Sequence, residues 1–282
     1  MNYCAGCEKI SSERSYYPSI ILRETESTNY DIEKLLNSGL INDEQLSGFH
    51  GYTEFAFMQT KGRGRFDRQW SSGHGGVYQS TLFFKELLGN LDFNMITTIA
   101  AVAVLNTVRD FINPEYHNDV KIKWPNDVTV KGNKVAGILI KSIIGYKPEV
   151  TPVIIGTGIN VFNEVSAGAL RNGSIISPGV LQSFSDARLD DESLIRISYA
   201  LLKNILDLIR LSADSKYNRI FNEYNDNLLY LGKKVKLYNL AETGDVIMEG
   251  TFTGVNLNSL IKIKNDNDGR EVEIPAGEIK LA

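Results

Sequence analysis

The hydrophobic residues of this chain recur at helical spacing in four segments. They return every three or four positions, so each segment would form a helix that buries one face against a core. The predicted helices cover residues 93–112, 194–211 and 220–229, with a shorter one directly after Thr28. Ser27 or Thr28 is the candidate N-cap of that shorter helix, because a hydroxyl there accepts a hydrogen bond from the first turn.

Between the helical segments, apolar residues form short runs bounded by Gly, Pro and Asn-Asp pairs. Runs of this length that are rich in Val and Ile are typical of strands, and their boundaries are typical of turns. The expected strands cover residues 19–23, 54–60, 77–84, 120–123, 135–140 and 153–159. Together with the helices, they predict one sheet flanked by helices.

From residue 231 onward the pattern changes to short alternating segments separated by Gly or Asn-Asp turns. Such closely spaced alternation is typical of a small β-barrel. The strands expected here cover residues 233–238, 246–255, 259–264 and 272–274. We therefore expect an α+β chain in three parts: a short leader (1–18), a larger domain with a sheet and helices (19–229), and a small β-domain (230–282).

Composition narrows the function classes. The chain has 282 residues, of which 43% are hydrophobic, and a net charge of −4, so it can bury an ordinary core and as a whole does not favour polyanions. No stretch approaches the ~20 apolar residues of a membrane helix, and the first residues lack a signal-peptide core. These features predict a cytoplasmic protein with no membrane and no nucleic-acid partner. Cys4 and Cys7 form a C-x-x-C pair without further zinc ligands nearby, so we expect inert thiols.

Residues 62–70, which read GRGRFDRQW, carry candidate chemistry. They set three arginines against one acid, Asp67, in a protein that is acidic overall. Gly62 and Gly64 let backbone amides approach a ligand, and arginine presents donors in forks that match phosphate and carboxylate oxygens. Spacing alone suits a solvated basic loop equally well. The preceding strand and Trp70, which offers a stacking surface for a purine, favour a folded anion site.

Two further elements carry polar groups at strand ends. Residues 123–127 read KWPND, and residues 156–160 read GTGIN. The first element is also what a tight turn between two strands requires, and the second is not a dinucleotide-binding glycine motif. Each is therefore weak evidence when taken alone.

Taken together and in this order, the elements resemble the biotin protein ligase family, in its monofunctional form without a DNA-binding domain. The resemblance covers roughly residues 20–160, and the C-terminal part resembles the family's SH3-like domain more loosely. The matching pieces are Ser27-Thr28-Asn29, Gln59, GRGRFDRQW, SSGHGGVYQS, VKIKWPNDV, KVAGILI and GTGIN.

This resemblance implies a fold, an activity and a partner. The fold would be a class II aminoacyl-tRNA-synthetase-like mixed sheet with flanking helices, followed by an SH3-like barrel. The activity would be a ligase that uses ATP and Mg²⁺ to convert biotin into biotinyl-5′-AMP. The biotin would then pass to a lysine of a biotin carboxyl carrier domain in a carboxylase. The resemblance is also compatible with a homodimer.

The resemblance also implies roles for individual residues. Lys123 and Arg65 would be catalytic, with the Lys123 ammonium bridging the biotin carboxylate and the α-phosphate of ATP. The residues that would bind biotin are Ser27, Thr28, Asn29, Gln59, Gly62, Arg63, Arg65, Lys123, Gly137, Ile138 and Leu139. The residues that would bind ATP or the adenylate are Arg63, Arg65, Arg68, Trp70, Asn126, Asp127 and Asn160. Mg²⁺ would be carried by ATP and lie near Asp127.

The sequence departs from the family pattern at several places. Lys141 follows Ile140 where the family usually has an acid, and residues 162–189 do not match what we expect there. The leader before residue 19 is shorter than a winged-helix domain.

Features of the sequence oppose three alternatives to a biotin ligase. A lipoate or octanoate ligase on a related fold is the nearest, but that family lacks GRGRxxRxW with KWPND. A nucleic-acid-binding regulator is opposed by the net charge. A binding protein with a degenerate site is opposed by the presence of Lys123 and all three loop arginines.

Overall fold

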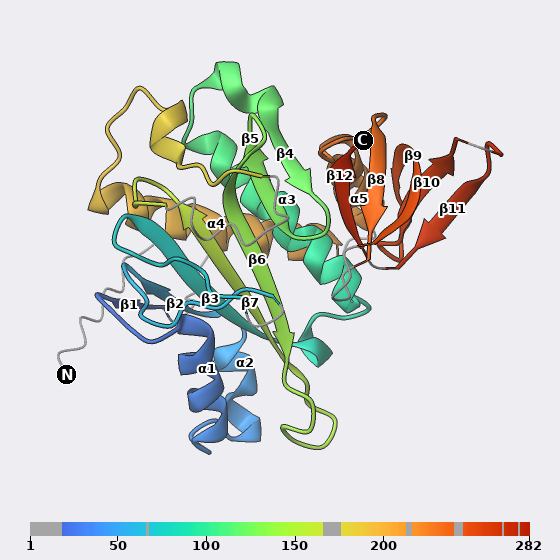
Figure 1. Cartoon of the computed structure of the whole chain (residues 1–282). Helices are drawn as coiled ribbons and strands as arrows, with labels where there is room; N and C mark the ends of the chain where they lie inside the picture. Colours follow the sequence, from blue (N-terminus) through green and yellow to red (C-terminus); the bar gives the residue numbers. More distant parts are fainter. Residues whose placement is uncertain are drawn as a thin grey trace.

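A computed structural model of the protein describes residues 19–65, 68–165, 176–212, 216–239, 245–266, 268–275 and 277–282. Within these residues the chain forms a large mixed sheet with helices on both faces and a smaller antiparallel sheet at the C-terminal end (Figure 1). The expected leader, residues 1–18 with Cys4 and Cys7, lies outside the described residues.

The large sheet has seven strands in the order β1-β2-β3-β7-β6-β5-β4. Strands β1 and β2 are parallel, and every other neighbouring pair is antiparallel. The strands are β1 (Ser19–Leu22), β2 (Tyr52–Ala56), β3 (Gly76–Phe84), β4 (Val120–Lys123), β5 (Asp127–Val130), β6 (Asn133–Ser142) and β7 (Pro152–Asn160).

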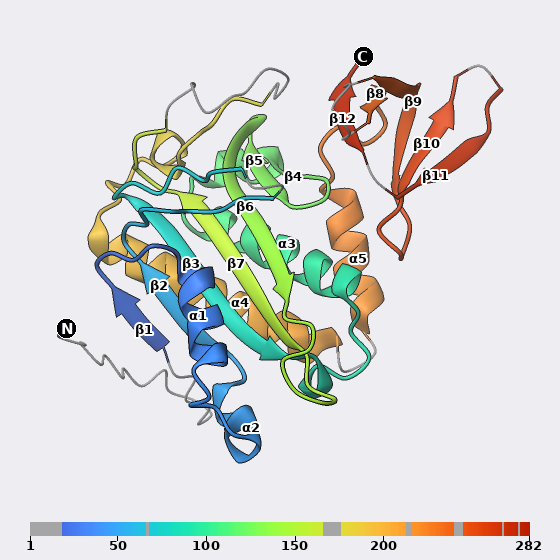
Figure 2. The same cartoon turned by 60° about the horizontal axis from the view of Figure 1, so that its bottom comes forward.

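Helices cover the two faces of this sheet unequally. The long helices α3 (Phe93–Asp110) and α4 (Asp191–Leu211) lie behind it, with α5 (Tyr217–Asp226) beside α3. Helix α1 (Thr28–Asn37) and the short α2 (Leu46–Phe49) lie on the opposite face, where α1 crosses in front of β2, β3 and β7 (Figures 1 and 2). Most of β5 and β6 on that face is therefore left without a helix. Short 3-10 turns cover Asp43–Gln45, Lys85–Leu87, Pro114–Asp119 and Leu181–Phe184.

Strand alternation explains why both faces of the sheet can be covered. Val153 and Ile155 of β7 point into the main core with α3 and α4, whereas Ile154 points to the other side. There it packs against Ile32 and Leu36 of α1, which the helical spacing places on one face. The continuous apolar runs in the sequence thus reflect strands buried on both sides.

The C-terminal sheet comprises β8 (Lys234–Tyr238), β9 (Val246–Val255), β10 (Ile261–Asn265), β11 (Glu271–Ile274) and β12 (Glu278–Leu281). Its strand order is β11-β10-β9-β8-β12, and all pairs are antiparallel. The sheet lies beside α5 and the β4 edge of the large sheet (Figure 1). Its buried interior consists of Val235, Leu237, Phe252, Val255, Ile261, Ile263 and Ile279.

The predicted α+β fold class, with a mixed sheet and a small C-terminal β-unit, is confirmed. Two strands were missed, β5 and β12, because each has only four residues and carries charged or polar side chains. The strand predicted over residues 54–60 is instead β2, which ends at Ala56, after which Gln59 forms only an isolated bridge with Thr25. Ser27 occupies the N-cap position of α1, but its side chain makes no capping hydrogen bond.

The placement of the domain boundary between residues 229 and 230 stays a prediction. Helix α5 ends at Asp226 and β8 begins at Lys234, so the connection between the two sheets lies between them. No helix among the described residues combines the length and the apolar character that crossing a membrane requires.

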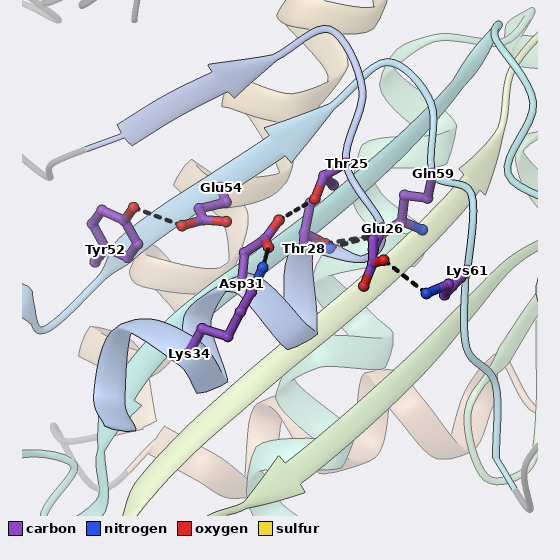
Figure 3. A network of polar contacts seen from close by, with 9 residues as sticks. All are labelled: Thr25, Glu26, Thr28, Asp31, Lys34, Tyr52, Glu54, Gln59 and Lys61. Atoms are coloured by element: carbon purple, nitrogen blue, oxygen red, sulfur yellow. Dashed lines mark hydrogen bonds and ion pairs between the residues drawn. The ribbon is translucent and has the colours of Figure 1, made fainter. Parts of the chain in front are cut away.

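One buried carboxyl group stands out in the large sheet. Glu54 of β2 is 6% exposed and faces α1 (Figure 3). Its Oε1 accepts a hydrogen bond of 2.7 Å from the Tyr52 hydroxyl, while Oε2 has no hydrogen-bond partner. Burial raises the pKa of Glu54 from 4.5 to about 7. The charge of Asp31 contributes to this rise, whereas the hydrogen bond from Tyr52 and the charge of Lys34 oppose it.

We predict that Glu54 makes the protein less stable as the pH rises. Since the folded state holds the proton more tightly than the unfolded state, stability falls between the unfolded pKa of 4.5 and the folded value of about 7. Glu54→Gln should remove this slope and gain up to about 3 kcal/mol above pH 7. Urea unfolding at a series of pH values measures the effect.

Glu249 provides the matched control. It is an exposed acid paired with Lys236, so Glu249→Gln should leave the pH slope unchanged and alter stability by at most about 1 kcal/mol. The same pH slope in wild type and Glu54→Gln would contradict the assignment to Glu54.

Candidate functional site

A row of four paired residues, two of them glycines, crosses the large sheet from β4 to β7. Lys123 pairs with Asp127, Asp127 with Gly137, and Gly137 with Gly158. Residues paired across neighbouring strands point to the same face, so the two glycines lie on the same face as Lys123 and Asp127. We call Lys123, Asp127, Gly137 and Gly158 the glycine row.

Trp70 lies over the two glycines of this row. A Cβ atom added to Gly158 would come within 2.5 Å of Trp70 Nε1, and one added to Gly137 within 2.9 Å of Trp70 Cζ3. Lys134 Nζ lies 5.0 Å from the centre of the indole ring and 2.8 Å from Asp127 Oδ1. Only glycine at both positions allows the indole to rest directly on the strands, so the row and the tryptophan form one unit.

A polar cluster lies two residues further along the same strands. Two residues span roughly 7 Å and preserve the face of the sheet. Here Gly156 of β7 pairs with Ser80 of β3, and a Cβ atom on Gly156 would come within 2.4 Å of Asn29 Nδ2. The Ser80 hydroxyl donates to Asn29 Oδ1 at 2.8 Å and lies 2.7 Å from Thr28 Oγ1. The first residues of α1 are thereby fixed over the sheet.

Gln59 joins this cluster to the arginine loop. Its Oε1 accepts from the Thr28 backbone N–H at 2.9 Å, and its Nε2 donates to Ser72 Oγ at 3.0 Å. Figure 3 shows Gln59 beside Thr28, with Lys61 reaching Glu26 on the neighbouring segment. Backbone hydrogen bonds between residues 25–26 and 58–61 hold the two segments side by side. The cluster is thus ordered by its own contacts.

Separate elements hold the arginines of the loop. Arg63 forms a bridge with Gln69, and its guanidinium lies 5.6 Å from the centre of the Tyr30 ring of α1. Arg65 donates from Nη1 to Asn126 Oδ1 at 3.0 Å. Arg68 is exposed, and its carbonyl accepts from the Gly64 N–H. The guanidinium groups of Arg63 and Arg65 are therefore tied to opposite sides of the site.

Asn126 is itself held in place by hydrogen bonds to β6. Its Nδ2 donates to the Ile138 carbonyl at 2.7 Å, and its own carbonyl accepts from the Ile138 N–H at 2.9 Å. Burial lowers the pKa of Arg65, with the charge of Asp127 raising it and that of Arg68 lowering it. Arginine keeps its charge in proteins, so a partly buried cation is maintained next to the glycine row.

Lys123 ends β4 at the other side of the row. Its side chain is only 13% exposed, and its Nζ lies 3.3 Å from Oε1 of Glu278, which belongs to the C-terminal sheet. An ammonium group with little exposure beside bound anions would interact with them more strongly than in water. Arg65 is bound to Asn126, in the turn that follows Lys123, so two cations lie at this end of the row of strands that carries Trp70.

The structure brings nearly all residues of the predicted site to one face. Ile138 is the correction: it is 2% exposed and belongs to the core behind the sheet, because strand alternation turns it away from Gly137 and Leu139. Asn160 is buried at the end of β7, where its Oδ1 accepts from Asn163 Nδ2 at 3.2 Å. Phe66 and Asp67 of the loop lie outside the described residues.

Two further residues of the predicted site, Gly62 and Ser27, are closely packed or buried. Gly62 packs so closely that an added Cβ would lie 2.2 Å from Ser72 Oγ, and Ser27 is buried at the start of α1. Sequence reasoning missed the contacts of Ser72 and Ser80, although both lie within the matched SSGHGGVYQS segment. It also missed Glu278, for which the sequence carries no signal, since nothing in it shows where the C-terminal sheet docks.

No metal centre is preformed among the residues that the structure describes. They contain no group of three or more His, Cys, Asp or Glu side chains positioned to bind a metal ion. Asp127 is the carboxylate of the glycine row, and its side chain is 19% exposed.

We predict that Gly158→Ala displaces Trp70. The added methyl group would lie within 2.5 Å of the indole, and overpacking of this kind typically costs about 1–3 kcal/mol unless the neighbour moves. Trp70 is one of two tryptophans, so its emission can be recorded alone in a Trp124→Phe background. The emission should shift to longer wavelength as the indole leaves its seat.

Gly73→Ala is the control, because nothing lies within 4 Å of a Cβ atom at that position. Its emission should match that of the parent. An unchanged spectrum for Gly158→Ala would show that Trp70 does not rest on the glycine row.

A protein-family model matches the part of the chain that contains the site described above. The model of the Biotin/lipoate A/B protein ligase family matches residues 25–160. This range begins just before α1 and ends at Asn160, so it contains the polar cluster, the arginine loop and the glycine row.

Individual relatives extend the match. The Biotin–[acetyl-CoA-carboxylase] ligase of Paracoccus denitrificans is 29% identical over 262 residues, covering 92% of this chain and 98% of that protein. Biotin–protein ligase 2 of Arabidopsis thaliana is 38% identical over 217 residues, covering 74% of this chain and 61% of that protein.

A solved structure shares the fold along most of the chain. The biotin protein ligase of Aquifex aeolicus, in complex with biotin and ATP, superposes with a TM-score of 0.71 at 23% identity, covering 95% of this chain and 99% of that one. With the family match over the site and relatives along nearly the whole length, this chain belongs to the biotin protein ligase family.

Proposed function

We propose that this chain activates biotin with ATP as biotinyl-5′-AMP and transfers the biotinyl group to a lysine of a carrier domain. The observation that carries the proposal is the glycine row, which holds a tryptophan stacking surface near two cations, Lys123 and Arg65, and two residues along the strand from a polar cluster. A mixed anhydride of an acid and AMP needs these three features side by side. The relatives named above are ligases that act with biotin.

The polar cluster suits the ureido ring of biotin. Thr28, Asn29 and Gln59 are buried or half-buried and offer hydroxyl and amide groups that hydrogen-bond a urea. An octanoyl or lipoyl chain could not hydrogen-bond this cluster and would shield its remaining donors and acceptors from water, which costs about 1–3 kcal/mol for each group left unsatisfied. The cluster therefore favours biotin over the acids used by the lipoate ligases, although the family model covers both.

The glycine row suits the nucleotide. One side of the Trp70 indole packs on the strands, and the other would stack on an adenine ring. The adenine would then displace the Lys134 ammonium, which lies near the indole ring in this structure. Arg63 and Arg68 are exposed and would reach the phosphates, and Asn160 would read the adenine edge. Gly137 and Leu139 would line the passage between the adenylate and the acyl chain, as the register of β6 with Gly158 and Gly156 indicates.

The first step joins the two substrates. A biotin carboxylate oxygen attacks the α-phosphorus, the bond between that phosphorus and the bridging oxygen breaks, and pyrophosphate leaves. Two anions must meet, so the step depends on fixed positive charge. Lys123 Nζ would lie between the carboxylate and the α-phosphate, and Arg65, held by Asn126, would stabilise the oxygens of the same phosphate.

Magnesium fits this site as a companion of ATP. Mg²⁺ is usually bound by one or two carboxylates together with substrate phosphates, and Asp127 is a carboxylate of the glycine row. When bound, the ion would neutralise charge on the triphosphate. Asp127 would orient it, with Lys134 at 2.8 Å holding the carboxylate in place.

The second step needs little more than proximity, because the anhydride is already activated. The neutral amine of a carrier lysine attacks the biotinyl carbonyl carbon, the bond to the AMP oxygen breaks, and a proton leaves the new amide nitrogen. The face of β5 and β6, which none of the described helices covers, would admit the carrier domain (Figure 2). A homodimer and the absence of a nucleic-acid partner stay predictions.

ATP–pyrophosphate exchange tests the proposed acid specificity directly. The wild-type protein is assayed with biotin, lipoate and octanoate side by side. Exchange should require biotin, with the other acids slower by at least about a hundredfold, because they cannot hydrogen-bond the polar cluster. Equal exchange with lipoate or octanoate would replace the proposal by a lipoate-type ligase, and exchange with none would remove acyl adenylation altogether.

Lys123→Ala should reduce the rate of biotin-dependent exchange by at least about a thousandfold, since a cation aimed at the developing charge is lost. Circular dichroism and thermal melting establish that the variant is folded. Lys203→Ala, on the exposed surface of α4, is the matched control and should keep full activity. Normal pyrophosphate release by Lys123→Ala would exclude Lys123 from the mechanism.

A further inference from the structure

The C-terminal sheet contacts the site at two consecutive residues. Glu278 Oε1 lies 3.3 Å from Lys123 Nζ, and the Ser259 carbonyl accepts from Trp124 Nε1 at 3.1 Å. Lys123 is the last residue of β4 and the first of the glycine row, and Trp124 follows it. The small sheet thus reaches the cation that the proposed first step depends on.

Alternation along β12 explains how Glu278 comes to this position. Ile279 is 4% exposed and points to the buried interior of the C-terminal sheet, so its neighbours Glu278 and Lys280 point away from that interior. Strand β12 is an edge strand, paired on one side with β8. Glu278 is 24% exposed and Lys123 13%, so both groups of the pair are largely shielded from water.

Docking of the C-terminal sheet does not depend on Glu278. Asn225 at the end of α5 makes two hydrogen bonds with Val255, from its Nδ2 to the carbonyl at 3.3 Å and from the Val255 N–H to its Oδ1 at 3.0 Å. Asn94 of α3 donates to the Asn258 carbonyl at 3.1 Å. These contacts and the Trp124 bond hold the sheet in place, so the carboxylate of Glu278 is available for another role.

We propose that Glu278 is a positioning residue for Lys123 in the adenylation step. A lysine has a flexible four-carbon stem and a compact charge, so its ammonium needs a partner to stay in one place before the substrates arrive. Glu278 provides that partner from the other sheet and holds Nζ at the edge of the glycine row. The inference rests on the proposed function, because adenylation is the step in which Lys123 acts.

The carboxylate also keeps the ammonium in a fixed orientation once biotin and ATP are bound. A misplacement of about 1 Å at a reacting centre can lower a rate about a hundredfold. Loss of Glu278 should therefore affect the rate of adenylation far more than the affinity for ATP, whose purine and phosphates have their own contacts with the large sheet.

The test measures biotin-dependent ATP–pyrophosphate exchange for Glu278→Ala, Glu278→Gln and the wild type. Glu278→Ala should lower kcat about 10- to 100-fold with the KM for ATP within about threefold. Glu278→Gln keeps an oxygen that accepts from the ammonium and should stay within about threefold of wild-type kcat. Asn94→Ala removes an interdomain hydrogen bond away from Lys123 and should leave kcat unchanged.

The outcomes separate the inference from the proposed function. A wild-type protein without biotin-dependent exchange would defeat the proposed function itself. With an active wild type, an unchanged kcat in Glu278→Ala would overturn the positioning role. So would a Gln variant as slow as the Ala variant, or equal losses in Asn94→Ala, which would indicate a general effect of docking. Thermal melting of each variant shows that the comparison is made between folded proteins.

Discussion

Close approach of side chains to the backbone of β6 and β7 is the constraint on which the site depends. Gly137 and Gly158, paired in register, let the Trp70 indole lie directly on the strands, and Gly156 does the same for the amide of Asn29. A single methyl group at any of these positions would occupy the space of its partner. Because strand alternation places Gly156 and Gly158 on one face, the proposed acyl and nucleotide pockets are fixed relative to each other by β7 alone.

The cations around this surface are held from different directions. Arg63 is set against Tyr30 of α1, Arg65 is bound by Asn126 of the β4–β5 turn, and Lys123 meets Glu278 of the C-terminal sheet. Like charges close together repel, so each cation needs its own anchor if it is to remain in place without a ligand. Arg63 and Arg65 are held by uncharged partners, Tyr30 and Asn126, whereas Lys123 is held by the carboxylate of Glu278.

Helices cover the sheet in a way that leaves this point accessible. The long helices α3 and α4 bury the rear face and provide most of the core, while α1 covers only the part of the front over β2, β3 and β7. The polar residues at the start of α1, Thr28 and Asn29, therefore border the uncovered part of the face. Stability comes mainly from one face of the sheet, and the chemistry is built on the other.

The sequence by itself determined the type of most elements, and it supplied the candidate residues of the site. Helical spacing identified α3 and α4, apolar runs identified most strands, and the motifs around Arg65, Lys123 and Asn160 identified the chemistry, because such signals are local along the chain. Short strands with charged residues, such as β5 and β12, gave no clear periodic signal. The family resemblance also implied that Ile138 lines the pocket, although strand alternation turns its side chain to the core.

Only the tertiary structure decided which distant residues meet. Strand register pairs Gly137 with Gly158 and so allows Trp70 to pack on both. Docking of the second sheet brings Glu278 to Lys123, although the two residues are 155 positions apart in the sequence. No local spacing encodes these contacts, because they depend on how separate elements pack. The sequence therefore specified the chemical groups, and the packing of two sheets specified their geometry.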